Sequence, residues 1–285
     1  MHPLLHIGPY TVASYGVCIV AGTALGLAWL VSWRDEIRRP EDSVGRFWQL
    51  LYVLCFGGLV GGKLGFVIVE LPFFWTHPAR LWRWNIGWVY WFAALGVMVA
   101  GKAYQEVMNR FVLPRPRAYL PIADYCATAG ALGHWVGRIG CFLNGCCHGK
   151  PTTLPWGVVF TNPAADMDPR FLGVPLHPTQ LIEAAGELAI GLWLARAALP
   201  RIRSKRWRQG TAFILYVLLY SALRFSDEFL RGDDRGVFLS PILSPSQWVS
   251  AAAFLAAAAA LWMRGVRVTD PARESPYLDG PAPAR

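Results

Sequence analysis

The sequence predicts an all-α, polytopic membrane protein with about seven transmembrane helices. Apolar residues fill 54% of the 285 positions, and charged residues only 16%, against about 25% in an ordinary soluble domain. Seven mainly apolar segments have the length of roughly 20 residues that a helix needs to cross the hydrocarbon core. Lys and Arg residues are concentrated in every second segment that connects these apolar segments. These observations exclude disordered, collagen-like and small disulfide-rich chains, and they disfavour a soluble enzyme.

The predicted spans are 11–33, 47–71, 86–108, 119–141, 178–199, 210–230 and 243–263. The first span has no basic segment before it and is too long for the apolar core of a cleavable signal peptide. We therefore expect it to be retained as a helix. Residues 1–268 are expected to form one transmembrane domain with a periplasmic insertion at about 142–177. The tail, 269–285, is rich in Pro and Ala, and we expect it to be disordered in the cytoplasm.

The basic residues outside the spans predict the orientation of the chain. In order from the N-terminus, the connecting segments carry none, four, two, three, two, six, two and four Lys or Arg residues, where the six include Arg196 near the end of the fifth span. Alternate segments thus hold 17 and six of them. The positive-inside rule puts the N-terminus outside and the C-terminus in the cytoplasm. No basic stripe interleaved with aromatic residues indicates nucleic-acid binding.

Polar residues inside the spans indicate a site. An intramembrane charge costs roughly 2.5–3.5 kcal/mol on insertion scales, so it must face protein or a water-filled cavity. With the predicted orientation, many of these residues and their neighbours fall at the outer ends of their spans: Tyr15, Arg138, His177, Gln180, Glu183, Arg224, Asp227, Glu228 and Arg231. Such clustering favours a site in the outer leaflet over scattered structural ion pairs. Arginine forks suit a phosphate ester, so a phospholipid head group is the expected ligand.

The segment 137–150 reads GRIGCFLNGCCHGK. Its glycines predict that the span breaks here, with a turn at Asn144-Gly145. Cys141, Cys146 and Cys147 lie close together in the chain. They lack the second ligand pair that usually accompanies a C-x₂₋₄-C zinc motif, so no metal is predicted. A disulfide to Cys141 or Cys126 and small buried thiols remain alternative states.

This segment resembles the signature G-R-x-G-N-F-x-N-x-E-x-x-G of the prolipoprotein diacylglyceryl transferase family. The matching positions are Arg138, Gly140, Phe142, Asn144 and Gly149. Family-like motifs follow in the family's order at 15–16, 61–64, 177–183, 224–231 and 243–247. The departures from the family pattern are Cys141 for Asn, Cys146 for Glu, Lys63 for Arg, and Trp91 where the family carries His or Tyr.

The resemblance implies a bacterial inner-membrane enzyme whose active site faces the periplasm and which needs no cofactor. Such enzymes move the diacylglyceryl group of phosphatidylglycerol onto the lipobox cysteine of a prolipoprotein signal peptide, forming a thioether. Arg138 and Arg224 would hold the phosphate, Glu228 would orient an arginine, and His148 is a candidate base. Asn144 and Tyr15 would bond the head group, and the expected substrate-binding set adds Lys63, Gly149, His177, Gln180, Glu183 and Arg231.

Three alternative functions remain. One is a related membrane transferase with a different lipid or thiol acceptor. Another is a catalytically impaired, lipid-binding paralogue, which Trp91, Cys141 and Cys146 favour. A transporter is disfavoured, because the cytoplasmic half of the spans lacks a polar path apart from Lys102 and Glu106.

Overall fold

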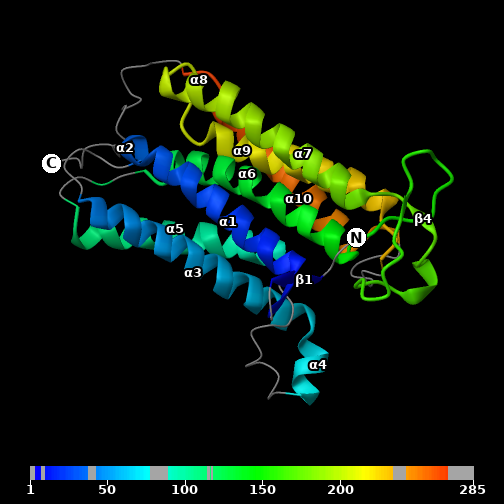
Figure 1. Ribbon diagram of the computed structural model, residues 1–285. Helices are drawn as coiled ribbons and strands as arrows, with labels where there is room; N and C mark the ends of the chain where they lie inside the picture. Colours follow the sequence, from blue (N-terminus) through cyan, green and yellow to red (C-terminus); the bar gives the residue numbers. More distant parts are fainter. Residues whose placement is uncertain are drawn as a thin grey trace. The chain divides into compact units, whose positions relative to one another are not determined.

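The computed structural model describes residues 4–7, 10–37, 43–77, 89–113, 116, 118–233 and 242–268. Helices dominate this part of the chain, as the sequence predicts (Figure 1). The chain divides into two compact units, one formed by Met1–Ser32 with Asp124–Glu274 and the other centred on Trp33–Ala123. The predicted tail, 269–285, lies outside the described residues.

The first unit is built mainly of helices. Its helices are α1 (Ser14–Ser32), α6 (Leu120–Asn144), α7 (Thr179–Trp193), α8 (Leu199–Arg203), α9 (Thr211–Asp227) and α10 (Pro245–Arg264). A π-helical turn, η3 (Leu194–Ala198), joins α7 to α8, and the 3₁₀ turn η4 (Glu228–Leu230) extends α9. A short hairpin of β1 (Leu4–Ile7) and β2 (Tyr10–Ala13) precedes α1.

Small residues allow α1 and α6 to approach closely. A Cβ atom at Gly22 would lie 2.4 Å from the carbonyl oxygen of Gly133, and one at Gly26 would lie 3.0 Å from that of Ala129. Small residues spaced four apart are typical of closely packed membrane helices. Since later residues of α1 meet earlier residues of α6, the two helices run antiparallel.

Side-chain contacts near the helix ends give the remaining directions within this unit. Asp124, near the start of α6, accepts hydrogen bonds from the backbone N–H groups of Gly210 (2.6 Å) and Phe213 (2.9 Å) at the start of α9. Arg264, at the end of α10, donates to the carbonyl oxygen of Gln209 at 3.0 Å. Helices α6 and α9 therefore begin at the same end of the unit, where α10 finishes. This alternation agrees with the directions expected from the basic residues.

The second unit is built on α3 (Val44–Val69) and α5 (Tyr90–Phe111), with the short helices α2 (Arg34–Ile37) and α4 (Leu71–Thr76). A Cβ atom at Gly61 would lie 2.4 Å from the carbonyl oxygen of Phe92, and one at Gly96 would lie 2.2 Å from that of Gly57. These glycines therefore hold α3 and α5 in antiparallel contact.

The segment between α6 and α7 consists of short elements and turns. It contains β3 (Val158–Val159), η2 (Pro169–Phe171) and β4 (Pro175–Leu176), and the two strands pair antiparallel. Phe160, which follows β3, and Leu176, in β4, are buried. Figure 1 shows this segment beyond the adjoining ends of α6 and α7.

Each of the seven segments predicted as spans overlaps a helix among the described residues, and the segment 178–199 is divided among α7, the π-helical turn η3 and the start of α8. Three of these helices are long and apolar enough to cross a membrane by length and composition alone: α1, α3 and α10. One local expectation was wrong: residues 11–13 belong to β2 instead of the first span. The turn expected at Asn144-Gly145 is present, since α6 ends at Asn144 and Gly145 has φ +85°. Gly140 lies inside α6 and serves close packing: a Cβ atom there would lie 2.7 Å from the Cβ of Cys18.

Candidate functional site

Helices α6, α7 and α9 present polar side chains to one another in a layer that we call the Arg138 rung. Arg138 on α6 forms an ion pair with Glu183 on α7. The hydroxyl of Tyr220 on α9 donates to the second oxygen of Glu183 at 3.1 Å. The Glu183 side chain is fully buried, and that of Arg138 is 11% exposed. The Glu183 carboxylate on α7 thus bonds side chains of two other helices, α6 and α9.

A second layer, the His134 rung, lies one helical turn away. His134 Nδ1 is 2.7 Å from Glu187 Oε1, to which the hydroxyl of Tyr216 donates at 3.3 Å. Each member is four residues from its counterpart in the Arg138 rung. The sequence analysis did not assign His134, Tyr216 or Tyr220 to the site. The signal available was this repeated four-residue spacing of polar residues in three apolar spans.

Arginines and carboxylates also gather where α9 ends. Arg224 pairs with Glu228, as predicted, and its Nη1 lies 3.6 Å from Asp227 Oδ2. Arg231 Nε is 3.8 Å from Glu228 Oε2. The same guanidinium donates two bonds, of 2.9 and 2.8 Å, to Asp233. Burial raises the pKa of the Asp233 carboxyl, although Arg231 opposes that effect. Asp233 is a site residue that the sequence analysis missed.

The two groups form one electrostatic cluster. Glu183 interacts with both Arg138 and Arg224, and Asp227 interacts with these arginines and with Arg231. The predicted convergence of guanidinium and carboxylate groups from distant spans is therefore present. Each arginine also keeps one buried N–H group, Arg138 Nε, Arg224 Nη1 and Arg231 Nη1, without a hydrogen-bond partner among the described residues. Unpaired buried donors are costly, and an oxygen-rich anion would satisfy them.

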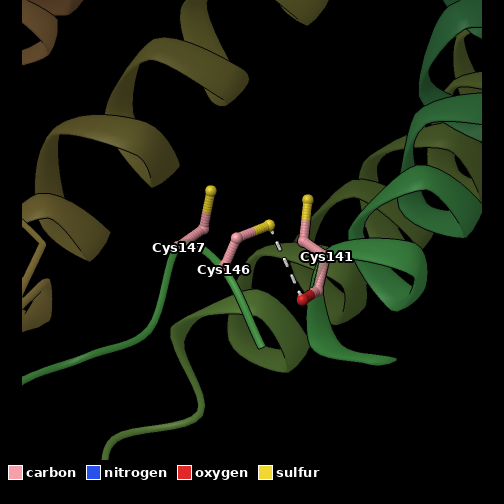
Figure 2. Close-up of side chains that lie close together, drawn as sticks. All are labelled: Cys141, Cys146 and Cys147. Carbon is pink, nitrogen blue, oxygen red and sulfur yellow. Dashed lines mark hydrogen bonds between the residues drawn. The ribbon is translucent and has the colours of Figure 1, made fainter. Parts of the chain in front are cut away.

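The turn after α6 carries three thiols. Gly145 (φ +85°) ends the helix, and Cys147 (φ +61°) adopts a left-handed conformation that is uncommon for a residue with a side chain. Figure 2 shows the side chains of Cys141, Cys146 and Cys147 gathered together, and their sulfur atoms all lie within 4.8 Å of one another. Hydrogen bonding from the thiols of Cys141 and Cys146 holds the pKa of the Cys147 thiol well below its usual range. None of the six cysteines, all of which lie within the described residues, forms a disulfide.

Backbone contacts explain the residues after this turn. Gly149 forms a β-bridge with Arg231, and a Cβ atom on it would lie 2.5 Å from the carbonyl oxygen of His177. The close approach at Gly149 is thus to protein backbone, where the sequence analysis expected substrate. His148 is buried; its Nδ1 bonds the Gly149 carbonyl oxygen at 3.0 Å, and its ring packs on Phe171.

Asn144 and His177 contact the insertion. The side-chain amide of Asn144 donates to Asp166 Oδ2 at 3.2 Å, and the backbone carbonyl oxygen of Asn144 accepts from the Asp166 backbone N–H at 2.8 Å. His177 Nδ1 accepts from the indole N–H of Trp156 at 3.3 Å. The N-cap of α7 is Pro178, without a side-chain bond, so His177 does not cap that helix. Both residues therefore fasten the insertion to the helices that it connects.

The remaining predicted residues divide between the two units. Gln180 is buried and donates to the carbonyl oxygen of Cys146 at 2.7 Å. Tyr15, on the first turn of α1, interacts electrostatically with the three clustered cysteines and with Arg138. Lys63 belongs to the second unit, where it is buried and its ammonium lies 5.4 Å from the centre of the Phe66 ring.

Comparison with known proteins identifies the family. The family model described as prolipoprotein diacylglyceryl transferase matches residues 2–263. Three similar proteins are each described as a phosphatidylglycerol–prolipoprotein diacylglyceryl transferase. That of Cupriavidus pinatubonensis is 34% identical, covering 86% of this chain and 84% of its own. The Clostridium tetani protein is 34% identical (83% and 86%), and that of Solidesulfovibrio magneticus is 34% identical (80% and 80%). The chain therefore belongs to the prolipoprotein diacylglyceryl transferase family.

Proposed function

We propose that this protein transfers the diacylglyceryl group of phosphatidylglycerol to the lipobox cysteine of prolipoprotein signal peptides. The observation that carries the proposal is the cluster of three buried arginines, each with a guanidinium N–H group that no described residue accepts. A family member with such a cluster has the donors that a phosphate ester requires.

The arginine cluster suits the leaving group of this reaction. The acceptor thiolate attacks the glycerol carbon that bears the phosphate, the C–O bond breaks, and glycerol 1-phosphate departs. Preorganised donors aimed at the oxygen where charge develops lower the barrier most in a site that excludes water. We assign this role to Arg138 and Arg224, because Glu183 and Glu228 already fix their orientation. Arg231, held by Asp233, completes the set.

The acceptor thiol must lose its proton, since a free thiol has a pKa near ~8.5. We assign to His148 the role of the base that accepts this proton. Its Nδ1–H donates to the Gly149 carbonyl, which leaves Nε2 as the proton-accepting atom. Tyr15 and Gln180 lie beside the turn that carries the cysteines and are placed to bond the head group or the peptide. Lys63 and Asn144 remain candidates for substrate contacts on the strength of the family motifs alone.

We further propose seven membrane spans in the bacterial inner membrane, with the N-terminus outside and the arginine cluster facing the periplasm. In this topology residues 1–268 form one transmembrane domain, and the segment 142–177 is a periplasmic insertion. Two observations support it. The helices of each unit alternate in direction, and basic residues concentrate in every second connecting segment.

Complementation of a strain depleted of its own transferase tests this function most directly. The wild-type chain should restore growth and lipoprotein modification. Purified protein with labelled phosphatidylglycerol and a lipobox peptide should form the thioether, with the glycerol phosphate released. Arg138→Ala should abolish transfer in both assays.

The matched control is Arg170→Ala. Arg170 lies in the insertion, 75% exposed and paired with Asp168, so its loss should leave transfer unchanged. Transfer at the wild-type rate in Arg138→Ala would remove the phosphate-binding role. Failure of the wild-type chain in both assays would favour a different acceptor or a paralogue that binds lipid without transferring it.

A further inference from the structure

The three thiols next to the arginine cluster have no assigned role in the transfer reaction. Cys141 is buried, and Cys146 and Cys147 are partly exposed. Their sulfur atoms lie within 4.8 Å of one another (Figure 2). The thiol of Cys146 bonds the carbonyl oxygen of Cys141 at 3.8 Å. The sequence spacing alone did not predict this arrangement, because the turn at Gly145 is what brings Cys146 and Cys147 back to α6.

The spacing of the sulfur atoms suits a small thiophilic cation. Zinc binds thiolates at about 2.3 Å, and tetrahedral angles at that distance separate ligand sulfurs by about 3.8 Å. The observed separations need to contract by no more than about 1 Å, which side-chain rotation supplies. Three thiolates leave one tetrahedral position for a further ligand, the arrangement of catalytic zinc sites.

The turn that carries two of the thiols is held from outside the cluster. Gln180 donates to the carbonyl oxygen of Cys146 at 2.7 Å, and Thr179 donates to that of Cys147 at 2.9 Å. Cys147 keeps its left-handed backbone conformation against the steric preference of a residue with a side chain. Such strain is found where the surrounding structure requires a particular side-chain position. These contacts are of the kind that orient ligands in metal sites.

Charge favours the same ligand. A zinc ion with three thiolates carries one net negative charge. Arg138 Nη1 donates to Cys141 Sγ at 3.8 Å, and Arg231 interacts electrostatically with Cys147. Guanidinium groups therefore already border the sulfur atoms. Since Arg138 is also our first candidate for the phosphate, a ligand in the open position would lie beside the reacting glycerol carbon.

We propose that Cys141, Cys146 and Cys147 bind Zn²⁺ as three thiolates, and that the open fourth position binds the acceptor thiol. This rests on the proposed function. The acceptor thiol releases its proton to solvent on binding. Its sulfur then forms the C–S bond to glycerol while the C–O bond breaks, and that electron pair leaves on the phosphate oxygen. The neutral thioether is a weaker ligand than a thiolate and leaves the zinc.

Metal binding is tested on the full chain, purified in detergent with a reductant that does not chelate metals. Elemental analysis should find about one zinc per chain. Replacement by Co²⁺ should give thiolate-to-cobalt charge-transfer absorption with tetrahedral d–d bands. Cys147→Ser should weaken metal binding by more than about 100-fold, the upper end of the loss that a mere supporting group causes. Cys126→Ser, on α6 but outside the cluster, is the matched control and should bind as the wild type does.

The fourth position is tested without turnover, in the absence of phosphatidylglycerol. A lipobox peptide should shift the cobalt d–d bands, and the same peptide with Ser in place of Cys should not. Three results overturn the inference: no metal bound through the three cysteines, identical spectra with the two peptides, or a disulfide among these cysteines in the purified protein.

The two proposals fail in different ways. If protein stripped of metal by a chelator transfers lipid at the wild-type rate, the zinc inference is wrong and the proposed function stands. If cobalt-loaded protein responds to the cysteine peptide but zinc-loaded protein never forms the thioether, the metal site stands and the proposed function is wrong.

Discussion

Removing the charge of Glu183 should destabilise the first unit strongly. Glu183→Gln keeps the size of the side chain and an oxygen for the Tyr220 hydroxyl, but it leaves the Arg138 guanidinium without its charged partner. Breaking a buried ion pair from one side costs about 3–5 kcal/mol, because the remaining charge stays out of water. Since 11% of the Arg138 side chain is still exposed, we expect a loss near ~3 kcal/mol in the free energy of unfolding.

The assay is thermal unfolding in detergent, followed by the fluorescence of the chain's 14 tryptophans. A loss of about 3 kcal/mol corresponds to a fall in Tm of roughly 6–12 °C for a chain of this size. Glu106→Gln is the matched control. Its ion pair with Lys102 on α5 is more than half exposed, so its loss should cost less than about 1 kcal/mol.

A double variant separates stability from function. Arg138→Leu with Glu183→Leu removes both charges and should unfold near the wild-type temperature or above it, because apolar replacement of a whole buried pair is often neutral or stabilising. It should nevertheless transfer no lipid. If Glu183→Gln unfolds at the same temperature as Glu106→Gln, the Arg138 rung is not a buried ion pair, and the reasoning fails.

Two further changes test the structure around the site. Gly149→Ala should lower the free energy of unfolding by about 1–3 kcal/mol and reduce transfer, because the new Cβ atom would lie 2.5 Å from the carbonyl oxygen of His177. Gly130→Ala is the control: a Cβ atom there would meet no atom within 4 Å, so the variant should be neutral or slightly stabilising in the same melting assay. Asp124→Ala should lower the free energy of unfolding by about 2 kcal/mol, because it removes two hydrogen bonds that cap α9. Asp168→Ala, which removes a cap from an exposed 3₁₀ turn, should change Tm little. Equal falls in Tm for the two variants would contradict the capping role of Asp124.

Sequence periodicity and composition predicted the helices well, for a physical reason. A segment that must satisfy its own backbone in lipid becomes a helix, and its length is set by bilayer thickness. Both requirements concern a single segment, so they can be recognised in the amino-acid sequence. The role of each glycine was less predictable: α6 ends at the expected Asn144-Gly145 turn, yet Gly140 lies inside α6, where it allows contact with Cys18 on α1. A glycine that packs and a glycine that ends a helix look alike until the neighbour is known.

The candidate site was predicted in part. The positions of Arg138, Arg224 and Glu228 near the predicted outer ends of their predicted spans indicated that they converge. In the structure, Glu183 interacts with both arginines, and Glu228 pairs with Arg224. Pairing within one helix, as between Arg224 and Glu228, follows from a four-residue spacing. The partner of Arg138 did not follow from the sequence, because several acidic residues were equally available to it.

The sequence by itself determined the membrane character, the helical segments and the residue types available for a phosphate ester. Only the tertiary structure decided which groups meet. It joined His134 to Glu187, turned Gly149 toward protein backbone, and brought Cys147 within reach of Cys141. Helical spacing fixes the face on which a side chain lies, but the rotation and neighbours of each helix depend on packing among small residues from distant parts of the chain. Contacts between helices are therefore a property of the folded molecule.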